Sequence, residues 1–101
     1  MYKVVINNDY GGFSLSEKCS RYLNEKYGFD IDVEYGYISD EVARHDVRLI
    51  EAIEFFGVNN AGGRFASLEI KEINSNIYKI DQYDGAEWIE TPDSIEWVVI
   101  D

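Results

Sequence analysis

The sequence predicts an α+β domain, an antiparallel β-meander of four to five strands with two helices packed on one face. Three observations support this fold class. The chain begins with a β-branched and aromatic run, two capped segments with helical spacing follow, and the C-terminal half consists of β-forming segments between turn signals. With 101 residues and 46% apolar side chains, the chain has the size and composition of one globular domain, residues 1–101.

Residues 2–7 predict a central strand because β-branched and aromatic side chains dominate them. Ser14, with Glu17 three residues later, has the spacing of a capping box and predicts a helix N-terminus at Ser14. Apolar residues then recur at helical spacing up to Tyr27, and Gly28 is a natural residue to end the helix.

Residues 29–35 alternate strictly between apolar and acidic side chains, which predicts a half-buried strand or extended arm. Asp46 then has the character of an N-cap for a second helix over 47–56, which Gly57 ends. Asp84-Gly85 is a strong type I′ hairpin signal within the C-terminal half. The β-forming segments predicted there are 64–73, 77–83, 86–90 and 95–100.

Charge is the unusual bulk property of the chain. Twenty acidic residues against nine Lys and Arg give a formal net charge of -11, and residues 80–101 contain seven acids and no Lys or Arg. Proteins bind nucleic acid without sequence specificity by neutralising phosphates with Lys and Arg, so this balance argues against direct nucleic-acid binding. It favours instead a protein partner with a basic surface.

The single cysteine, Cys19, permits no intrachain disulfide, and no apolar run reaches the length of a membrane span. The sequence therefore predicts a cytoplasmic protein with no membrane partner. No cofactor or resident metal is expected.

The loop around Gly11-Gly12 lies between a strand and a helix start, where free N–H groups favour an anion. It lacks the spacing of a P-loop, and Asp9 would repel a phosphate, so a tight structural turn with Phe13 in the core is the competing interpretation. The candidate ligand-binding residues, with Arg44 as the counter-charge, are Asp9, Tyr10, Gly11, Gly12, Ser14 and Arg44.

Catalytic signals are weak, so the chain is more readily explained as a binding protein than as an enzyme. His45 lies beside Asp46, but Asp46 is better explained as a helix cap. Cys19 lies on the apolar helix stripe, where cysteine is usually a small buried hydrophobe. A metal-dependent hydrolase would need at least two carboxylates from Asp9, Asp81, Asp84 and Glu87 to converge, whereas Glu87 is expected to point to solvent.

Three sequence blocks resemble a small protein family found in bacteriophages, giant viruses and some bacteria: NDYGGFSLS at 8–16, RHDxRLI at 44–50 and YDGxE at 83–87. Family members carry proline at the position of Val47. The family has no settled activity, but the resemblance implies that residues of the three blocks converge on one site or network: Asp9, Arg44, Asp46, Asp84 and Glu87.

Acidic single-domain phage proteins often act by binding a host factor, which leads to the principal functional hypothesis. The chain is expected to inhibit a basic, nucleic-acid-handling host or defence protein, as DNA-mimicking anti-restriction and anti-CRISPR proteins do. A nucleotide-like small-molecule binder or sponge using the Gly11-Gly12 turn is the alternative, and a metal-dependent hydrolase the second. Aromatic anchors are expected at Tyr35, Tyr37, Trp88 or Trp97. The candidate partner-binding residues are Asp81, Tyr83, Asp84, Glu87, Trp88, Glu90, Asp93 and Glu96.

Overall fold

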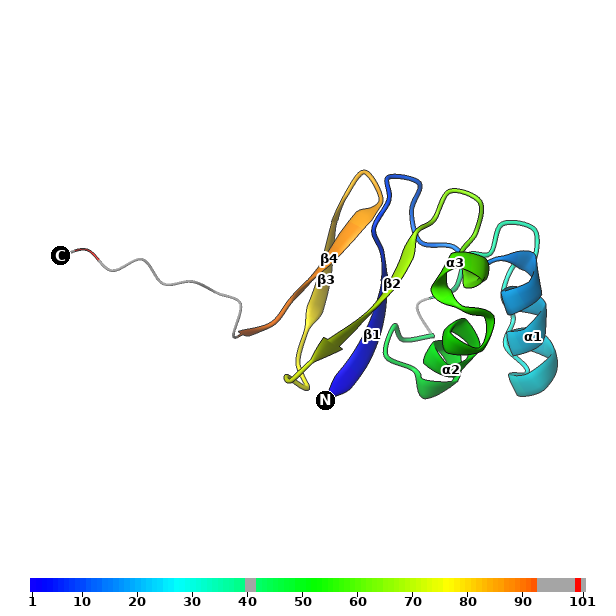
Figure 1. Ribbon diagram of the computed structural model, residues 1–101, viewed down its shortest axis with the longest axis horizontal. Coiled ribbons are helices and arrows are strands. Elements are labelled where there is room, and N and C mark those ends of the chain that lie inside the picture. The colour runs from blue at the N-terminus through cyan, green and yellow to red at the C-terminus, as the bar shows by residue number, and fades with distance from the viewer. Residues whose placement is uncertain (40–41, 93–99, 101) are drawn as a thin grey trace.

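A computed structural model of the chain describes residues 1–39, 42–92 and 100 (Figure 1). It has the α+β architecture that the sequence predicts. The helices and strands of the described residues are, in chain order, β1 (Tyr2–Asn7), α1 (Glu17–Tyr27), α2 (Val47–Phe56), α3 (Val58–Ala61), β2 (Leu68–Ile73), β3 (Lys79–Tyr83) and β4 (Ala86–Glu90). The short α3 has no counterpart among the predicted elements.

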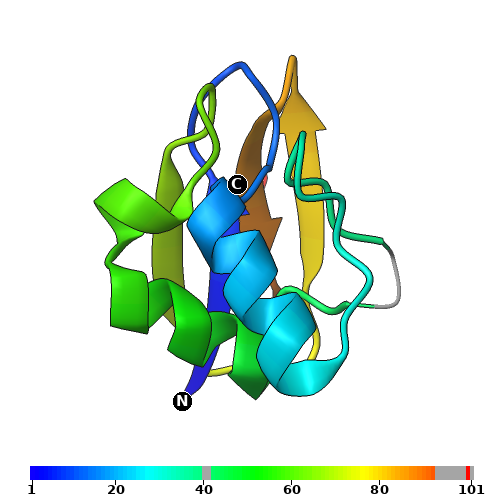
Figure 2. The ribbon, with the colours of Figure 1, turned by 90° about the vertical axis from the view of Figure 1, so that its right-hand side faces the viewer.

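The described strands form two antiparallel pairs, β1 with β2 and β3 with β4. The consecutive strands β2 and β3 are not hydrogen-bonded to each other, so the meander expected across residues 74–76 is replaced by pairing of β2 with the N-terminal strand. Seen from the helical side, the strands lie behind α1 in the order β2, β1, β4, β3 (Figure 2). Of the predicted strand 95–100, all but Ile100 lies outside the described residues.

Strand β1 is central to the fold, as predicted. Val4, Val5, Ile6 and Asn7 are consecutive and all buried, although successive side chains of a strand point to opposite faces. Both faces of β1 are therefore covered. The core around Val5 is completed largely by side chains from the helices and loops: Phe13, Leu15, Cys19, Leu23, Ile31, Leu49, Ile50, Ala52, Ile53, Ala61 and Leu68.

Helix α2 begins as predicted, because the Asp46 carboxylate accepts a hydrogen bond from the Arg48 amide at 2.9 Å. The side-chain hydrogen bond from Arg48 to the same carboxylate lowers the pKa of Asp46. The prediction for α1 was wrong by two residues. The N-cap is Ser16, whose hydroxyl accepts from the Cys19 amide at 3.2 Å, whereas Ser14 is buried ahead of the helix.

The strand predicted over 29–35 is a loop, because side chains take the place of strand partners there. The Asn24 amide both donates to the Ile31 carbonyl and accepts from its N–H, each at 2.9 Å. At the next residue, the Asp32 carboxylate accepts a hydrogen bond from the Glu34 amide at 3.0 Å and turns the chain. Gly36 completes the turn with a left-handed φ of 73°.

Candidate functional site

Arg44 and Glu87 form a partly buried ion pair where β4 lies beside β1. Two parallel hydrogen bonds of 2.7 and 2.8 Å join the guanidinium to the carboxylate, and the side chains are only 21% and 10% exposed. The guanidinium also lies 3.8 Å from the centroid of the Phe13 ring. This bidentate, stacked geometry is one that arginine satisfies and lysine does not.

The same two residues accept hydrogen bonds from backbone N–H groups on the edge of β1 that does not pair with β2. The Val5 amide donates to the Arg44 carbonyl at 3.0 Å, and the Asn7 amide donates to Glu87 Oε1 at 2.8 Å. A buried strand edge with unpaired N–H groups would destabilise the fold. Arg44 and Glu87 thus accept the hydrogen bonds that a further strand would otherwise accept from β1.

Asn7, which is fully buried, links three loops at one end of the molecule. Its Nδ2 donates to the carbonyls of Asp9 at 2.7 Å and Gly85 at 2.8 Å, and its Oδ1 accepts from the Ser67 amide at 2.8 Å. At Gly85 a Cβ would lie 2.5 Å from the Gly12 amide nitrogen. The tip of the β3–β4 hairpin therefore packs directly on the glycine loop, as Figure 1 shows.

These contacts correct one prediction and qualify another. Glu87 points into the structure and not to solvent, and Arg44, the predicted counter-charge for a ligand, is paired with Glu87. Of the five residues expected to converge, Arg44 and Glu87 do so through their side chains. Asp9 contributes its carbonyl, Asp84 forms the hairpin turn at a φ of 54°, and Asp46 pairs with Arg48 on α2.

The glycine loop does border a groove. A cavity of about 710 Å³ lies between this loop, the start of α1, the turn around Gly36 and the loop over 62–65. Of the predicted ligand residues, Gly11 and Ser14 line it, whereas Asp9, Tyr10, Gly12 and Arg44 do not. The basic residue in its wall is Arg64, which the sequence reasoning missed; a second glycine pair, Gly62-Gly63, directly before it was the available signal.

The hairpin divides the predicted partner-binding residues between two faces. In the β3–β4 register Asp81 lies opposite Trp88, and both are exposed. Tyr83 shares this outer face and is 70% exposed, and Asp84 is exposed at the turn. Glu87 belongs to the inner face and drops out of the set. Asp93 and Glu96 lie outside the described residues.

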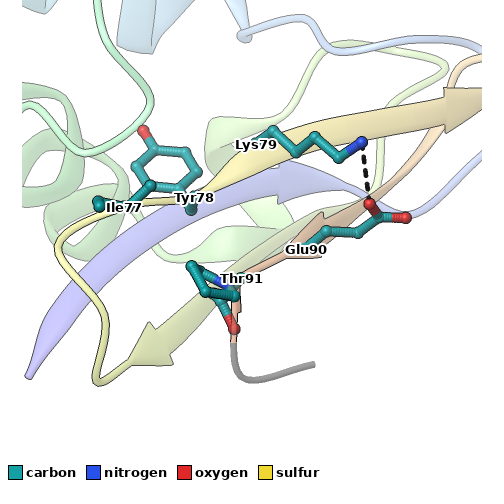
Figure 3. Close-up of a pocket in the computed structure, with 6 residues that line it drawn as sticks. Ile77, Tyr78, Lys79, Glu90 and Thr91 are labelled. Carbon is teal, nitrogen blue, oxygen red and sulfur yellow. Dashed lines mark ion pairs between the residues drawn. The ribbon is translucent and has the colours of Figure 1, made fainter. Parts of the chain in front are cut away.

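Glu90, also on the outer face, is engaged within the hairpin. Its carboxylate accepts from the Trp88 indole N–H at 3.1 Å and pairs with Lys79 at 3.2 Å, and these contacts lower its pKa. Figure 3 shows the Lys79–Glu90 pair beside a cavity of about 280 Å³ that Ile77, Tyr78, Thr91 and Pro92 also line.

Cys19 and His45, the catalytic candidates of the sequence, are both held in contacts within the fold. Cys19 is buried, and burial raises the pKa of its thiol to about 11, so the thiolate needed of a nucleophile is scarce near neutral pH. His45 Nδ1 lies 2.7 Å from the Tyr78 hydroxyl.

No group of three potential metal ligands is found within residues 1–39 and 42–92. No helix in this part is long and apolar enough to cross a bilayer.

Ion pairing leaves a large surplus of negative charge on the surface. Within the described residues, six of the Lys and Arg side chains are paired with carboxylates. Nine exposed carboxylates in the same ranges have no such pair: Asp9, Glu25, Asp30, Asp32, Glu34, Glu51, Glu72, Asp81 and Asp84.

Comparisons of the chain with family models, with curated proteins and with solved structures gave no match.

Proposed function

We propose that this chain is a small acidic binding protein that inhibits a basic, nucleic-acid-handling host or defence protein by occupying its nucleic-acid surface. It belongs, in this proposal, to a phage-type family and acts in the host cytoplasm. The observation that carries the proposal is the set of nine exposed carboxylates without ion pairs in the described part of the chain. Such a surface repels nucleic acid and steers a basic partner toward it.

The outer face of the β3–β4 hairpin is the part of this surface best suited to tight contact. It combines two carboxylates, Asp81 and Asp84, with two aromatic side chains, Tyr83 and Trp88. Charges across an interface mainly raise the association rate, whereas buried aromatic anchors contribute most of the affinity. Glu87 and Asn7 hold the hairpin against β1, so these side chains are presented from a fixed base.

Binding to a panel of purified restriction endonucleases and RNA-guided nucleases, at low and at high salt, tests the proposal. We expect at least one complex whose affinity falls as salt rises. The double variant Asp81→Asn, Asp84→Asn should weaken that complex about tenfold, equivalent to about 1.4 kcal/mol. The fold should be unaffected because both side chains are exposed and form no ion pair among the described residues.

The matched control is Glu25→Gln with Glu51→Gln, which removes the same charge from exposed sites on α1 and α2. It should change the affinity by less than the hairpin variant does. Equal weakening by both variants would show that only net charge matters and that the hairpin is not the docking face. Binding that ignores salt, or no binding by any nuclease at low salt, would contradict the proposal itself.

A further inference from the structure

The groove beside the glycine loop has features that the proposed inhibitor function does not use. Its volume, about 710 Å³, lies in the range of small-molecule sites. Three segments far apart in the sequence form it, residues 11–17, 34–37 and 62–65, and glycines let them approach. A Cβ at Gly11 would collide with Phe65, and one at Gly63 would lie 2.9 Å from Ser14 Cβ.

Two stacked tyrosine rings form one wall of the groove. The rings of Tyr35 and Tyr37 are 6.0 Å apart and nearly parallel at 17°, and they are 59% and 58% exposed. Gly36 between them fixes their position, because its carbonyl accepts from the Leu15 amide at 2.8 Å and its amide donates to the Asp32 carbonyl at 2.6 Å. An exposed aromatic pair on an anchored turn offers a flat face for a planar ring.

Arg64 supplies a positive charge to the same groove. It forms no ion pair among the described residues, and its guanidinium lies 5.4 Å from the centroid of the Phe65 ring, another exposed aromatic in the lining. An arginine held against an aromatic ring keeps its N–H donors free for an anionic group. Glu34, also in the lining, is an exposed carboxylate that can accept from a ring N–H.

We propose that this groove binds a small molecule made of a planar ring and one anionic group, with the ring against Tyr35 and Tyr37 and the anion on Arg64. The net charge of -11 and the two carboxylates in the lining, Glu17 and Glu34, oppose a more highly charged ligand. A nucleoside monophosphate and an aromatic carboxylate both have the required chemistry. A nucleoside triphosphate should bind less tightly than the monophosphate.

Isothermal titration of the full chain with adenosine monophosphate, adenosine triphosphate, adenosine, inorganic phosphate and indole-3-acetate tests this site. Binding of the monophosphate or of the indole acid, tighter than that of adenosine or phosphate alone, is expected. Arg64→Gln should weaken it about tenfold, as loss of a charged hydrogen bond typically does. Tyr35→Leu should weaken it as well, because a flat ring loses its stacking partner.

Lys18→Gln is the matched control, because it removes the same charge from an exposed α1 residue outside the groove lining. Circular dichroism verifies that each variant folds. Failure of both ring-bearing anions to bind, or equal weakening by Arg64→Gln and Lys18→Gln, would overturn the site. Tighter binding of indole-3-acetate than of adenosine monophosphate would identify the groove as a site for aromatic carboxylates. None of these results bears on nuclease binding by the hairpin, so the two proposals fail separately.

Discussion

Replacing Glu87 with alanine is expected to lower the free energy of unfolding by about 3–5 kcal/mol. The substitution leaves the Arg44 guanidinium without its partner and removes the acceptor of the Asn7 amide on the open edge of β1. Small domains are stabilised by only about 5–15 kcal/mol in total, so this loss would be conspicuous in a urea unfolding curve.

The control for Glu87 is on the same hairpin. Lys79→Ala breaks the exposed Lys79–Glu90 pair, and exposed pairs contribute about 0–1 kcal/mol. A double-mutant cycle with Arg44→Met then separates the coupling of Arg44 and Glu87 from the loss of either side chain alone. If Glu87→Ala destabilised the protein no more than Lys79→Ala, the pair would not be what holds the hairpin to β1.

Replacing Gly85 with alanine is expected to destabilise the fold for two separate reasons, its backbone conformation and its contact with the glycine loop. Gly85 has a φ of 92°, and its added Cβ would lie 2.5 Å from the Gly12 amide nitrogen and 2.7 Å from the Tyr10 carbonyl oxygen. The backbone conformation costs about 1–2 kcal/mol and the overlap about 1–3 kcal/mol more. Thermal unfolding of the variant measures the total loss of stability from these two costs.

Gly12→Ala separates the two effects. Gly12 also has a positive φ, 86°, but no atom within 4 Å of an added Cβ, so it should show the conformational cost alone. A Gly85→Ala variant no less stable than Gly12→Ala would mean that the hairpin tip does not pack on the glycine loop.

The sequence predicted elements well where the signals were local. The Asp46 cap, the Asp84-Gly85 turn and the strand over residues 2–7 are each decided by a few neighbouring residues, and all were confirmed. Residues 29–35 were mispredicted because Asn24, on α1, supplies the hydrogen bonds that a strand partner would have supplied. Apolar alternation alone carries no information about such a partner.

The site was predictable only in part for the same reason. The sequence blocks indicated that Arg44 and Glu87 belong together, but not that they neutralise each other across 43 residues of sequence. Arg44 and Arg64 are indistinguishable in sequence as candidate counter-charges. Only the fold shows that Arg44 is paired and stacked on Phe13, whereas Arg64 lines the groove.

Competition with duplex DNA is the measurement that tests the proposed inhibitor function most directly. A nuclease that binds this protein is mixed with labelled DNA and increasing amounts of the protein, and the fraction of DNA bound is followed by fluorescence anisotropy. If the exposed carboxylates occupy the nucleic-acid surface, DNA is released completely and more DNA restores its binding. A stable ternary complex of nuclease, DNA and this protein would contradict the account.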